Sequence, residues 1–455
     1  METGLSTATA GKYFARLCIA TLAPIITLSS YGSTTAAQFE KQPLLTWWQG
    51  KNASGTWLGL RPTLEDRGIS LSGYWKSSQI FLTGGGRANR ARNAFDEEIK
   101  FAVTLDLEKL AGIPGLSAYG NVRWRDGENI NEFVGASPTF NPSALESGLG
   151  WRFGQAYFTW QSQNLFPAKN LLTLSAGWQN PFYFFAQQLL SKEFSNNTIV
   201  SSKGLGANNT IWSSSYAAWG GHLKLQPSDE FYAQAGLYMA IPEGSRSGNH
   251  GLDFAGYATD PGSNGLYYLG EIGFTPRIGS TQLPGKYALG GMYFGVKNKT
   301  FFANSRSGSY QLYCQADQML WREPPPAATA ANRPPLDEQG LHSITFLSFS
   351  PPENSRLPLY FHTGLLYCGL IPTRDADWFA IGFASGTYSA DKIHAEEQAG
   401  LCIHQTYEAV FEIDYEAVLN RFASIKPFFE YLIRPDGTGQ IPNASLLGLS
   451  FDVKF

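Results

Sequence analysis

The sequence predicts an all-β fold, a single closed antiparallel β-barrel that spans a membrane with about 16 strands, and three observations support it. Apolar and polar residues alternate with period 2 in many segments, as expected for strands whose two faces meet different surroundings. Short turns alternate with long loops, which is typical of barrels that cross membranes. Glycine occurs 48 times and aromatic residues make up 14% of the chain, which favours strands and turns over helices.

The composition argues against two other classes of protein. The 455 residues include 34 Lys and Arg against 37 Asp and Glu, a formal net charge of −3, whereas nucleic-acid binders usually carry a basic domain or stripe. We therefore expect no nucleic-acid partner. Disorder is disfavoured because 43% of the residues are hydrophobic and can bury enough area to offset chain entropy.

The N-terminal region predicts export. Basic residues, an apolar run at 17–28 and small residues up to Ala37 follow one another in the order of a secretory signal. An uncleaved anchor helix is the alternative, but this run is too short to cross about 30 Å of hydrocarbon. Pro62 and Gly68 then predict a short helix before the first strand. We expect a signal peptide at 1–37, a periplasmic segment with a short helix at 38–68, and a barrel at 69–455.

Strands are predicted from the alternation of side chains. In the segment 99–108, Ile99 and Phe101 lie on one face, and Lys100 and Thr104 lie on the other. Sixteen such segments lie near residues 69–82, 99–108, 116–125, 151–161, 171–179, 216–225, 231–240, 266–275, 287–297, 309–319, 341–349, 357–367, 378–388, 403–415, 424–433 and 445–455.

Loop lengths support two distinct rims. Long connections rich in Gly, Asn and Ser are predicted at 83–98, 126–150, 182–215 and 241–265. Two connections break the pattern. The connection 350–356 is short although it lies on the rim of long loops, and the Pro-rich segment 320–340 is long although it lies on the rim of short turns. We expect the Pro-rich segment to be a stiff exposed spacer.

A soluble β-sandwich or propeller would also alternate, so the aromatic residues decide between the alternatives. They recur at strand ends on the apolar face, as in girdles at two membrane interfaces, at Trp124, Trp160, Trp178, Tyr268, Phe274 and Phe451. A spanning sheet must close on itself because hydrocarbon offers no partner to backbone N–H and C=O groups.

Three parts of the chain resemble the carbohydrate-selective outer-membrane porins (OprB-like). GTWLGLRPTLEDRGI at 55–69 is similar to the family's W-G-G-x-R…L-x-x-x-G-I entry, with Leu58 in place of the first Gly. GLIPTRDADW at 369–378 is similar to the turn G-L-x-P-x-R-x-x-D. The closing run from 427 to the terminal Phe455 resembles P-x-x-Q-Y-x-x-x-P-G-G…G-L-R…F, and it departs from this pattern at Glu430 and Asp436.

The resemblance implies a 16-stranded barrel in the outer membrane of a Gram-negative-type bacterium, which passes monosaccharides or small carbohydrates by facilitated diffusion. A barrel of this kind contacts outer-membrane lipid. The last strand ends on the aromatic Phe455, which resembles the assembly signal of outer-membrane barrels, so we expect the barrel-assembly machinery as a partner. Monomer and homotrimer both remain open. Cys314, Cys368 and Cys402 are scattered and allow at most one bridge, and we expect neither a metal nor another cofactor.

In sixteen-stranded porins the third long loop folds inward, and in this chain that loop is 182–215. It contains aromatic rings that can stack on a sugar, and charged groups that can exchange hydrogen bonds with hydroxyls, among them Phe184, Lys192, Glu193 and Trp212. The alternative is that the aromatic run at 182–185 continues a strand into the girdle.

Alternation also selects residues of the pore wall. Because Val122 and Trp124 face outward, Asn121, Arg123 and Arg125 face inward. Further inward charges of both signs are expected at Glu271, Glu412, Glu430 and Lys426, and also at Glu408, Asp414 and Glu416. Opposed charges across a narrow pore orient hydroxyl-rich solutes, although solvated wall charges without a binding role are the alternative for each one.

Two other functions are weighed against transport. A hydrolytic barrel would need a serine, a histidine and an orienting polar group within hydrogen-bond reach, and His362 and His404 lie on candidate strands. No GxSxG motif accompanies them, so we predict that the chain is not an enzyme. A plugged structural or adhesive barrel is the second alternative.

Overall fold

The computed structural model describes residues 47–142, 149–163, 171–208, 217–240, 250–255, 265–302, 305–324 and 339–455. Several predicted features lie outside them: the signal peptide, Trp212, most of the long connection at 241–265 and most of the Pro-rich connection. Within the described ranges, no helix is both long enough and apolar enough to cross a membrane.

The described strands form one antiparallel sheet. The first eight are β1 (Ile69–Gly84), β2 (Arg92–Asp106), β3 (Leu116–Gly127), β4 (Gly150–Gln161), β5 (Leu172–Gln179), β6 (Ala218–Leu225), β7 (Phe231–Ala240) and β8 (Gly265–Phe274). The others are β9 (Arg277–Ile278), β10 (Leu283–Lys299), β11 (Ser305–Arg322), β12 (Gly340–Phe349), β13 (Leu359–Cys368), β14 (Trp378–Thr387), β15 (Tyr407–Val418), β16 (Ala423–Ile433) and β17 (Ala444–Lys454).

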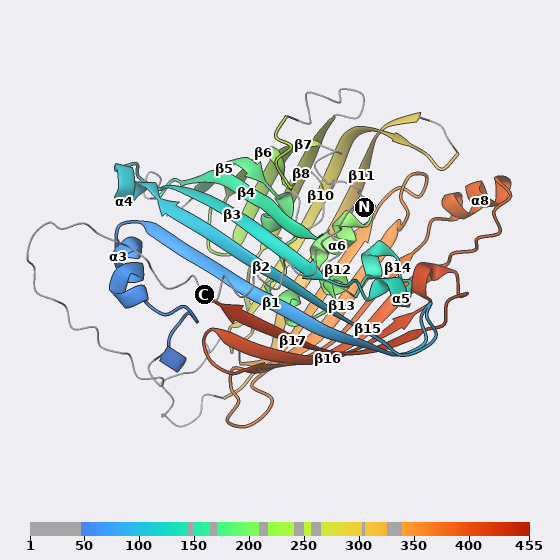
Figure 1. Ribbon diagram of the computed structural model, residues 1–455. Helices are drawn as coiled ribbons and strands as arrows, with labels where there is room; N and C mark the ends of the chain where they lie inside the picture. The colour runs from blue at the N-terminus through green and yellow to red at the C-terminus, as the bar shows by residue number, and fades with distance from the viewer. Residues whose placement is uncertain are drawn as a thin grey trace, which may run out of the picture. The chain divides into compact units, whose positions relative to one another are not determined.

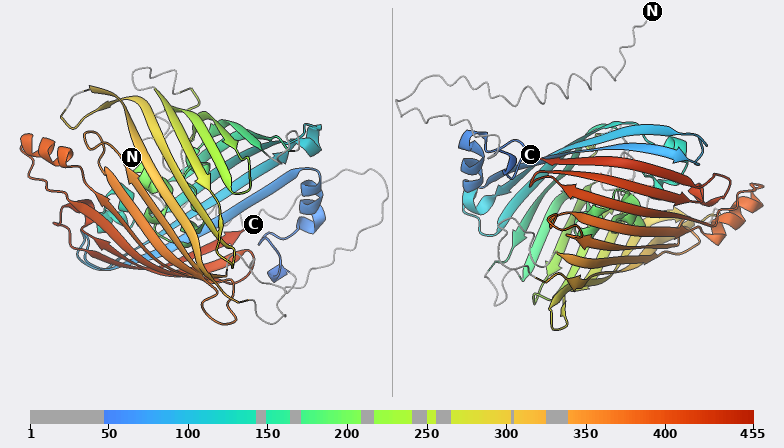
Figure 2. Two further views of the ribbon diagram at one scale, coloured as in Figure 1. Left: turned by 180° about the vertical axis from the view of Figure 1, so that it is seen from behind. Right: turned by 90° about the horizontal axis from the view of Figure 1, so that it is seen from below.

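The sheet closes into a barrel because its first strand has a partner on each side. Trp75 of β1 lies opposite Ile99 of β2 and opposite Val453 of β17. Figures 1 and 2 show the first strands, in blue, beside the last, in red. The two-residue β9 only pairs with the beginning of β10, so 16 strands form the wall, which confirms the predicted fold. Closure leaves no unpaired edge.

The two faces of the wall have opposite chemistry. Many large apolar side chains on the outer face are exposed, and five of them are 50–59% exposed: Phe101, Phe158, Ile272, Leu289 and Leu312. Many polar side chains on the inner face are buried, and five of them are at most 4% exposed: Gln155, Glu271, Gln311, Glu412 and Glu430. The outer face therefore suits hydrocarbon, while the inner face is covered by other parts of the chain.

Trp178, which was predicted for the aromatic girdle, is covered. Its ring centroid lies 5.6 Å from that of Trp219 and 5.0 Å from that of Phe254, and only 2% of the residue is exposed. Phe254 belongs to the β7–β8 connection, and the indole nitrogen of Trp219 donates to its carbonyl at 3.0 Å.

Several strand boundaries differ from the prediction, and the starts of two strands change how predicted features are read. β2 begins at Arg92, so the connection predicted at 83–98 is short and covers only 85–91. The polar Asn93 and Glu97 lie on its outer face and hide the alternation; the indole nitrogen of Trp75 donates to Glu97 at 2.8 Å. β15 begins at Tyr407, so His404 precedes the strand.

Short helices fill the connections. The 3₁₀ helices are η1 (Trp57–Gly59), η2 (Pro138–Phe140), η4 (Pro181–Tyr183), η5 (Leu189–Glu193), η6 (Asn197–Ile199) and η9 (Pro435–Gly437). The α-helices are α3 (Leu60–Asp66), α4 (Leu107–Ala111), α5 (Asn131–Val134), α6 (Ser201–Gly206) and α8 (Ala390–Gln398). The predicted short helix before the first strand is therefore present, with Pro62 inside it and Gly68 after it at φ +92°.

Helix α4 takes the last two residues of the predicted strand 99–108. Asp106 ends β2, and its side chain accepts hydrogen bonds from the backbone N–H groups of Glu108 and Lys109. This N-cap starts a helix where the alternation of side chains alone predicts two more strand residues.

Gly73 lies on β1, at the seam where β1 pairs with β17 and closes the barrel, and a substitution there tests the packing of this closing seam. A Cβ atom at Gly73 would lie 2.5 Å from the Phe455 ring and 2.6 Å from the carbonyl oxygen of Lys100. The N–H of Phe455 also donates to the Gly73 carbonyl at 3.0 Å. We expect Gly73→Val to lower the free energy of unfolding by about 1–3 kcal/mol, measured by urea titration of the refolded protein in detergent micelles. Gly270→Val is the control, because a Cβ atom at Gly270 meets nothing within 4 Å; equal losses in both variants would contradict the prediction.

Candidate functional site

The connection between β5 and β6 crosses the inside of the barrel. We call its described part, residues 180–208, the constriction loop. At its start the N–H of Asn180 donates to Gln155 Oε1 of β4 at 3.0 Å. At its end Asn208 exchanges two 2.8 Å hydrogen bonds with the backbone of Leu357, in the β12–β13 connection. Since β5 stops at Gln179 and a 3₁₀ turn follows, the aromatic run at 182–185 does not continue the strand.

Glu271 of β8 anchors the middle of the constriction loop. Its carboxylate accepts hydrogen bonds from the backbone N–H of Ala186 at 2.7 Å and from Gln234 Nε2 at 2.7 Å. The hydroxyl groups of Tyr232 and Tyr313 donate to it at 2.7 and 2.6 Å. Because four donors converge on this one side chain, it is an effective fixed point for the loop.

A second anchor lies on β15 and β16. Glu412 Oε1 accepts from the backbone N–H groups of Ser195 at 2.7 Å and Asn196 at 2.8 Å. The Asn196 amide donates to Glu430 Oε2 at 2.9 Å, and Asp414 Oδ1 accepts from the Ser195 hydroxyl at 2.6 Å. The chain thus uses adjacent buried carboxylates to hold two consecutive loop residues.

Lys426 contacts the loop as a hydrogen-bond donor, whereas the carboxylates contact it as acceptors. Its ammonium donates to the carbonyl oxygens of Glu193 at 2.8 Å and Lys192 at 3.2 Å, and lies 3.6 Å from Glu416 Oε2. The structure therefore brings Glu271, Glu412, Glu430 and Lys426 against the loop, whereas alternation alone placed them on an open wall. Their contribution to sugar binding stays a prediction.

The predicted residues of the loop differ in their surroundings. The Lys192 side chain is 73% exposed, whereas Glu193, whose carboxylate lies 3.5 Å from the Lys192 ammonium, is 3% exposed. The Phe184 ring stacks on His222 with centroids 4.5 Å apart, and meets the ring of Tyr157 edge-on at 5.7 Å.

A row of basic residues crosses the inner wall on β2, β3 and β4. Lys100 pairs in register with Arg123, and Arg123 pairs with Arg152. We call these three residues the cationic row. The Arg123 guanidinium donates to the Tyr183 hydroxyl of the constriction loop, and its Nη1 lies 3.7 Å from Glu98 Oε1. Wall and loop therefore meet at Arg123.

Glu98 is the acidic partner of the basic wall. It also forms an ion pair with Arg125 and accepts a hydrogen bond from the Tyr74 hydroxyl. Asn121, the third predicted wall residue, donates to the Tyr119 hydroxyl at 3.3 Å. Asn121, Arg123 and Arg125 are thus on the inner face, as alternation predicts, and the partner of both arginines is on the neighbouring strand.

Lys100 and the tyrosines around it were not selected from the sequence. The Lys100 ammonium lies 5.8, 5.9 and 5.8 Å from the ring centroids of Tyr74, Tyr119 and Tyr183, within range of cation–π attraction. Lys100 could have been found, because it lies on the polar face of a recognised strand. Glu98 precedes the predicted start of that strand at residue 99, so the alternation of side chains did not assign it to either face.

The histidines considered for hydrolysis lie in different places. His362 Nε2 is 2.7 Å from Gln188 Oε1 and helps to hold the constriction loop. His404 lies in the β14–β15 connection, where its Nδ1 is 3.3 Å from Glu397 Oε1 on an exposed surface.

The loop contact at Glu193 predicts a dependence on pH. Burial, together with the hydrogen bond to Glu416 and repulsion from it, raises the pKa of Glu193 from 4.5 to about 8. The neutral form therefore suits the folded loop, and the free energy that holds the loop falls as pH rises from 4.5 through about 8. We expect open-channel current noise of the wild type to increase between pH about 6 and about 9.

Glu193→Gln stays neutral and is expected to remove this dependence, while Glu65→Gln, at an exposed residue of α3, keeps it. An unchanged pH profile in Glu193→Gln would show that another group is responsible.

Comparisons with known proteins agree with this architecture. The family model described as "Carbohydrate-selective porin, OprB family" matches residues 93–455, well over half of the chain. Porin B of Pseudomonas aeruginosa is 21% identical over 434 residues, covering 88% of this chain and 90% of that protein.

Two solved structures have the same fold. The high-pH structure of OprB from Pseudomonas putida superposes with a TM-score of 0.79 at 20% identity, covering 90% of this chain and 99% of the other. The low-pH structure of OprB from Pseudomonas putida gives a TM-score of 0.57 at 15% identity over the same shares of the two chains. The matched proteins are porins, which are channels and not enzymes, and this confirms the prediction that the chain is not an enzyme. The chain belongs to the family of carbohydrate-selective porins, the OprB family.

Proposed function

We propose that monosaccharides and other small carbohydrates cross this porin by facilitated diffusion, through the part of the barrel that the cationic row and the constriction loop border. The observation that carries the proposal is the contact of Arg123 with both Glu98 of the wall and Tyr183 of the loop. Basic donors, a carboxylate acceptor and an aromatic ring meet at this one point.

This combination suits a neutral, hydroxyl-rich solute. Arginine presents several N–H donors in a fixed fork, a carboxylate accepts hydrogen bonds from hydroxyl groups, and an aromatic face packs against the C–H groups of a sugar ring. Arg123, Arg125 and Asn121 would supply donors from the wall. Phe184 and Lys192 would border the path from the loop. Trp212, outside the described residues, is proposed for the same border.

The remaining predicted residues are proposed to act at a distance from the sugar. Glu193, Glu271, Glu412, Glu430 and Lys426 would set the width of the path because they contact the loop or belong to it.

The family and the apolar outer face of the barrel support a location. We propose the outer membrane of a Gram-negative-type bacterium, with lipid against the exposed apolar side chains. Residues 1–37 would be the export signal and 38–68 the periplasmic segment. Recognition by the barrel-assembly machinery is proposed for Phe455, whose ring lies 5.3 Å from that of Phe101 at the closing seam.

The wall arginines provide the test. Hydrogen bonds to charged groups are worth about 1.5–3 kcal/mol, so Arg123→Ala combined with Arg125→Ala should weaken the block of ion current by glucose about tenfold or more. The measurement is current through single channels in planar bilayers, titrated with glucose. Liposome swelling with a panel of sugars then ranks the permeating solutes.

Arg67→Ala combined with Lys109→Ala is the matched control. It removes the same charge from two exposed residues. Arg67 directly follows α3, and Lys109 lies in α4. A glucose block equal to the wild type in the Arg123 and Arg125 variant would remove both arginines from the sugar path. A protein that forms no channels would instead support the plugged barrel.

A further inference from the structure

A second connection also enters the barrel. The described part of the β3–β4 connection, residues 128–142, contains α5 and η2, and we call it the second loop. Ile130, Val134 and Phe140 in this loop are completely buried, and Asn141 is 3% exposed. None of the residues selected from the sequence lies in this loop, so its position in the barrel needs a separate physical cause.

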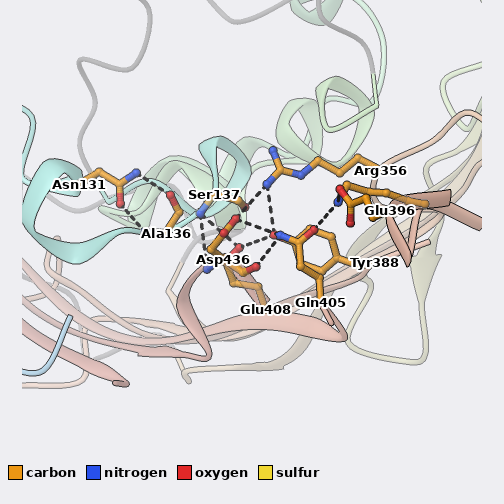
Figure 3. Close-up of polar contacts among 10 residues, drawn as sticks. Asn131, Ala136, Ser137, Arg356, Tyr388, Glu396, Gln405, Glu408 and Asp436 are labelled. Carbon is orange, nitrogen blue, oxygen red and sulfur yellow. Dashed lines mark hydrogen bonds and ion pairs between the residues drawn. The ribbon is translucent and has the colours of Figure 1, made fainter. Parts of the chain in front are cut away.

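Glu408, at the beginning of β15, holds the second loop. Its two carboxylate oxygens lie 3.1 and 3.3 Å from the backbone nitrogen of Ser137, which donates to them. The carboxylate also accepts from the backbone N–H of Asp436 at 2.9 Å and from the Tyr388 hydroxyl at 3.2 Å. The side chain is completely buried, and every one of these contacts is a hydrogen bond to a neutral donor. Figure 3 shows Ser137, Tyr388 and Asp436 around Glu408.

The contacts of Glu408 join separate connections of the barrel. Ser137 comes from β3–β4, Tyr388 from β14–β15 and Asp436 from β16–β17. Arg356, from β12–β13, lies 3.1 Å from Asp436 Oδ1, and Gln405 donates to the Asp436 carbonyl at 2.7 Å. Glu408 is therefore the shared acceptor of a network that four connections build.

The second loop in turn supports the constriction loop. The Thr198 hydroxyl donates to the carbonyl of Thr139 at 3.1 Å, and the Lys203 ammonium lies 3.5 Å from the carbonyl of Pro138. The Phe140 ring lies 6.3 Å from the ring of Tyr360, and the Tyr360 hydroxyl donates to the carbonyl of Thr198. Residues directly after Ser137 thus contact the loop that narrows the path.

We propose that Glu408 is a positioning residue for solute selection, which sets the constriction through Ser137 and the second loop without touching the sugar. This inference rests on the proposed function. A buried carboxylate is a strong acceptor for N–H donors, and its removal leaves those donors without a partner inside the protein. The second loop would then lose its fixed point, and the contacts of Pro138 and Thr139 with the constriction loop would weaken.

The test compares two substitutions of Glu408 by liposome swelling and single-channel recording. Glu408→Ala is expected to raise the permeation of the disaccharide maltose relative to glucose at least about threefold, and to add open-channel current noise. Glu408→Gln retains an oxygen acceptor of the same reach, and is expected to restore both values close to the wild type. A barrel-stability defect alone would leave the maltose-to-glucose ratio unchanged in channels that insert.

Ser137→Pro removes the same hydrogen bond from the other side. Ser137 has φ −66°, which proline adopts, so this substitution deletes the N–H donor and preserves that backbone angle. Its maltose-to-glucose ratio should match that of Glu408→Ala, and the double variant should show no further increase. This variant also serves as the test if Glu408→Ala does not insert.

Glu397→Gln is the matched control. Glu397 is an exposed acid on α8, where its Oε1 lies 3.3 Å from His404 Nδ1, and it belongs to the same β14–β15 connection as Tyr388. Its ratio should equal the wild type. The inference is wrong if wild-type channels pass glucose while Glu408→Ala or Ser137→Pro discriminates against maltose as the wild type does. Wild-type channels that pass no sugar would contradict the proposed function instead.

Discussion

Closure of the sheet is the constraint on which the rest of the molecule depends. Hydrocarbon offers no partner to a backbone N–H or C=O group, so a strand with a free edge is not stable inside a membrane. β1 removes that edge because it pairs with β2 and β17 at the same time. Once the ring is closed, each strand has an inner face that is shielded from lipid, and polar side chains there can hold loops.

The inner face divides its charges between two tasks. Glu271 and Glu412 accept hydrogen bonds from the backbone of the constriction loop, and Glu408 accepts one from the second loop. Lys100 and Arg123, in contrast, lie where wall and loop approach each other. This division explains how a chain with 37 acidic and 34 basic residues presents a row of cations toward the constriction loop. Glu271, Glu412 and Glu408 are engaged with backbone N–H groups, whereas Glu98 pairs with Arg123 and Arg125.

Much of the wall could be predicted, because alternation is a local property of a strand. The inward positions of Asn121, Arg123 and Arg125 follow from their outward neighbours, and all sixteen wall strands were found. The prediction failed where another local force competed with alternation. Asn93 and Glu97 are polar on the outer face and concealed the beginning of β2, and the Asp106 cap ended it two residues early.

The sequence by itself determined the barrel, its number of strands, the faces of the strands and the family, since periodicity and motifs are written in consecutive residues. Only the tertiary structure decided what the inward side chains contact. Ser137 and Glu408 are 271 positions apart, and nothing near either residue indicates the other. Their contact depends on the register of sixteen strands and on the positions that the second loop and the β16–β17 connection take inside the barrel. Residues distant in sequence become partners only when the sheet closes.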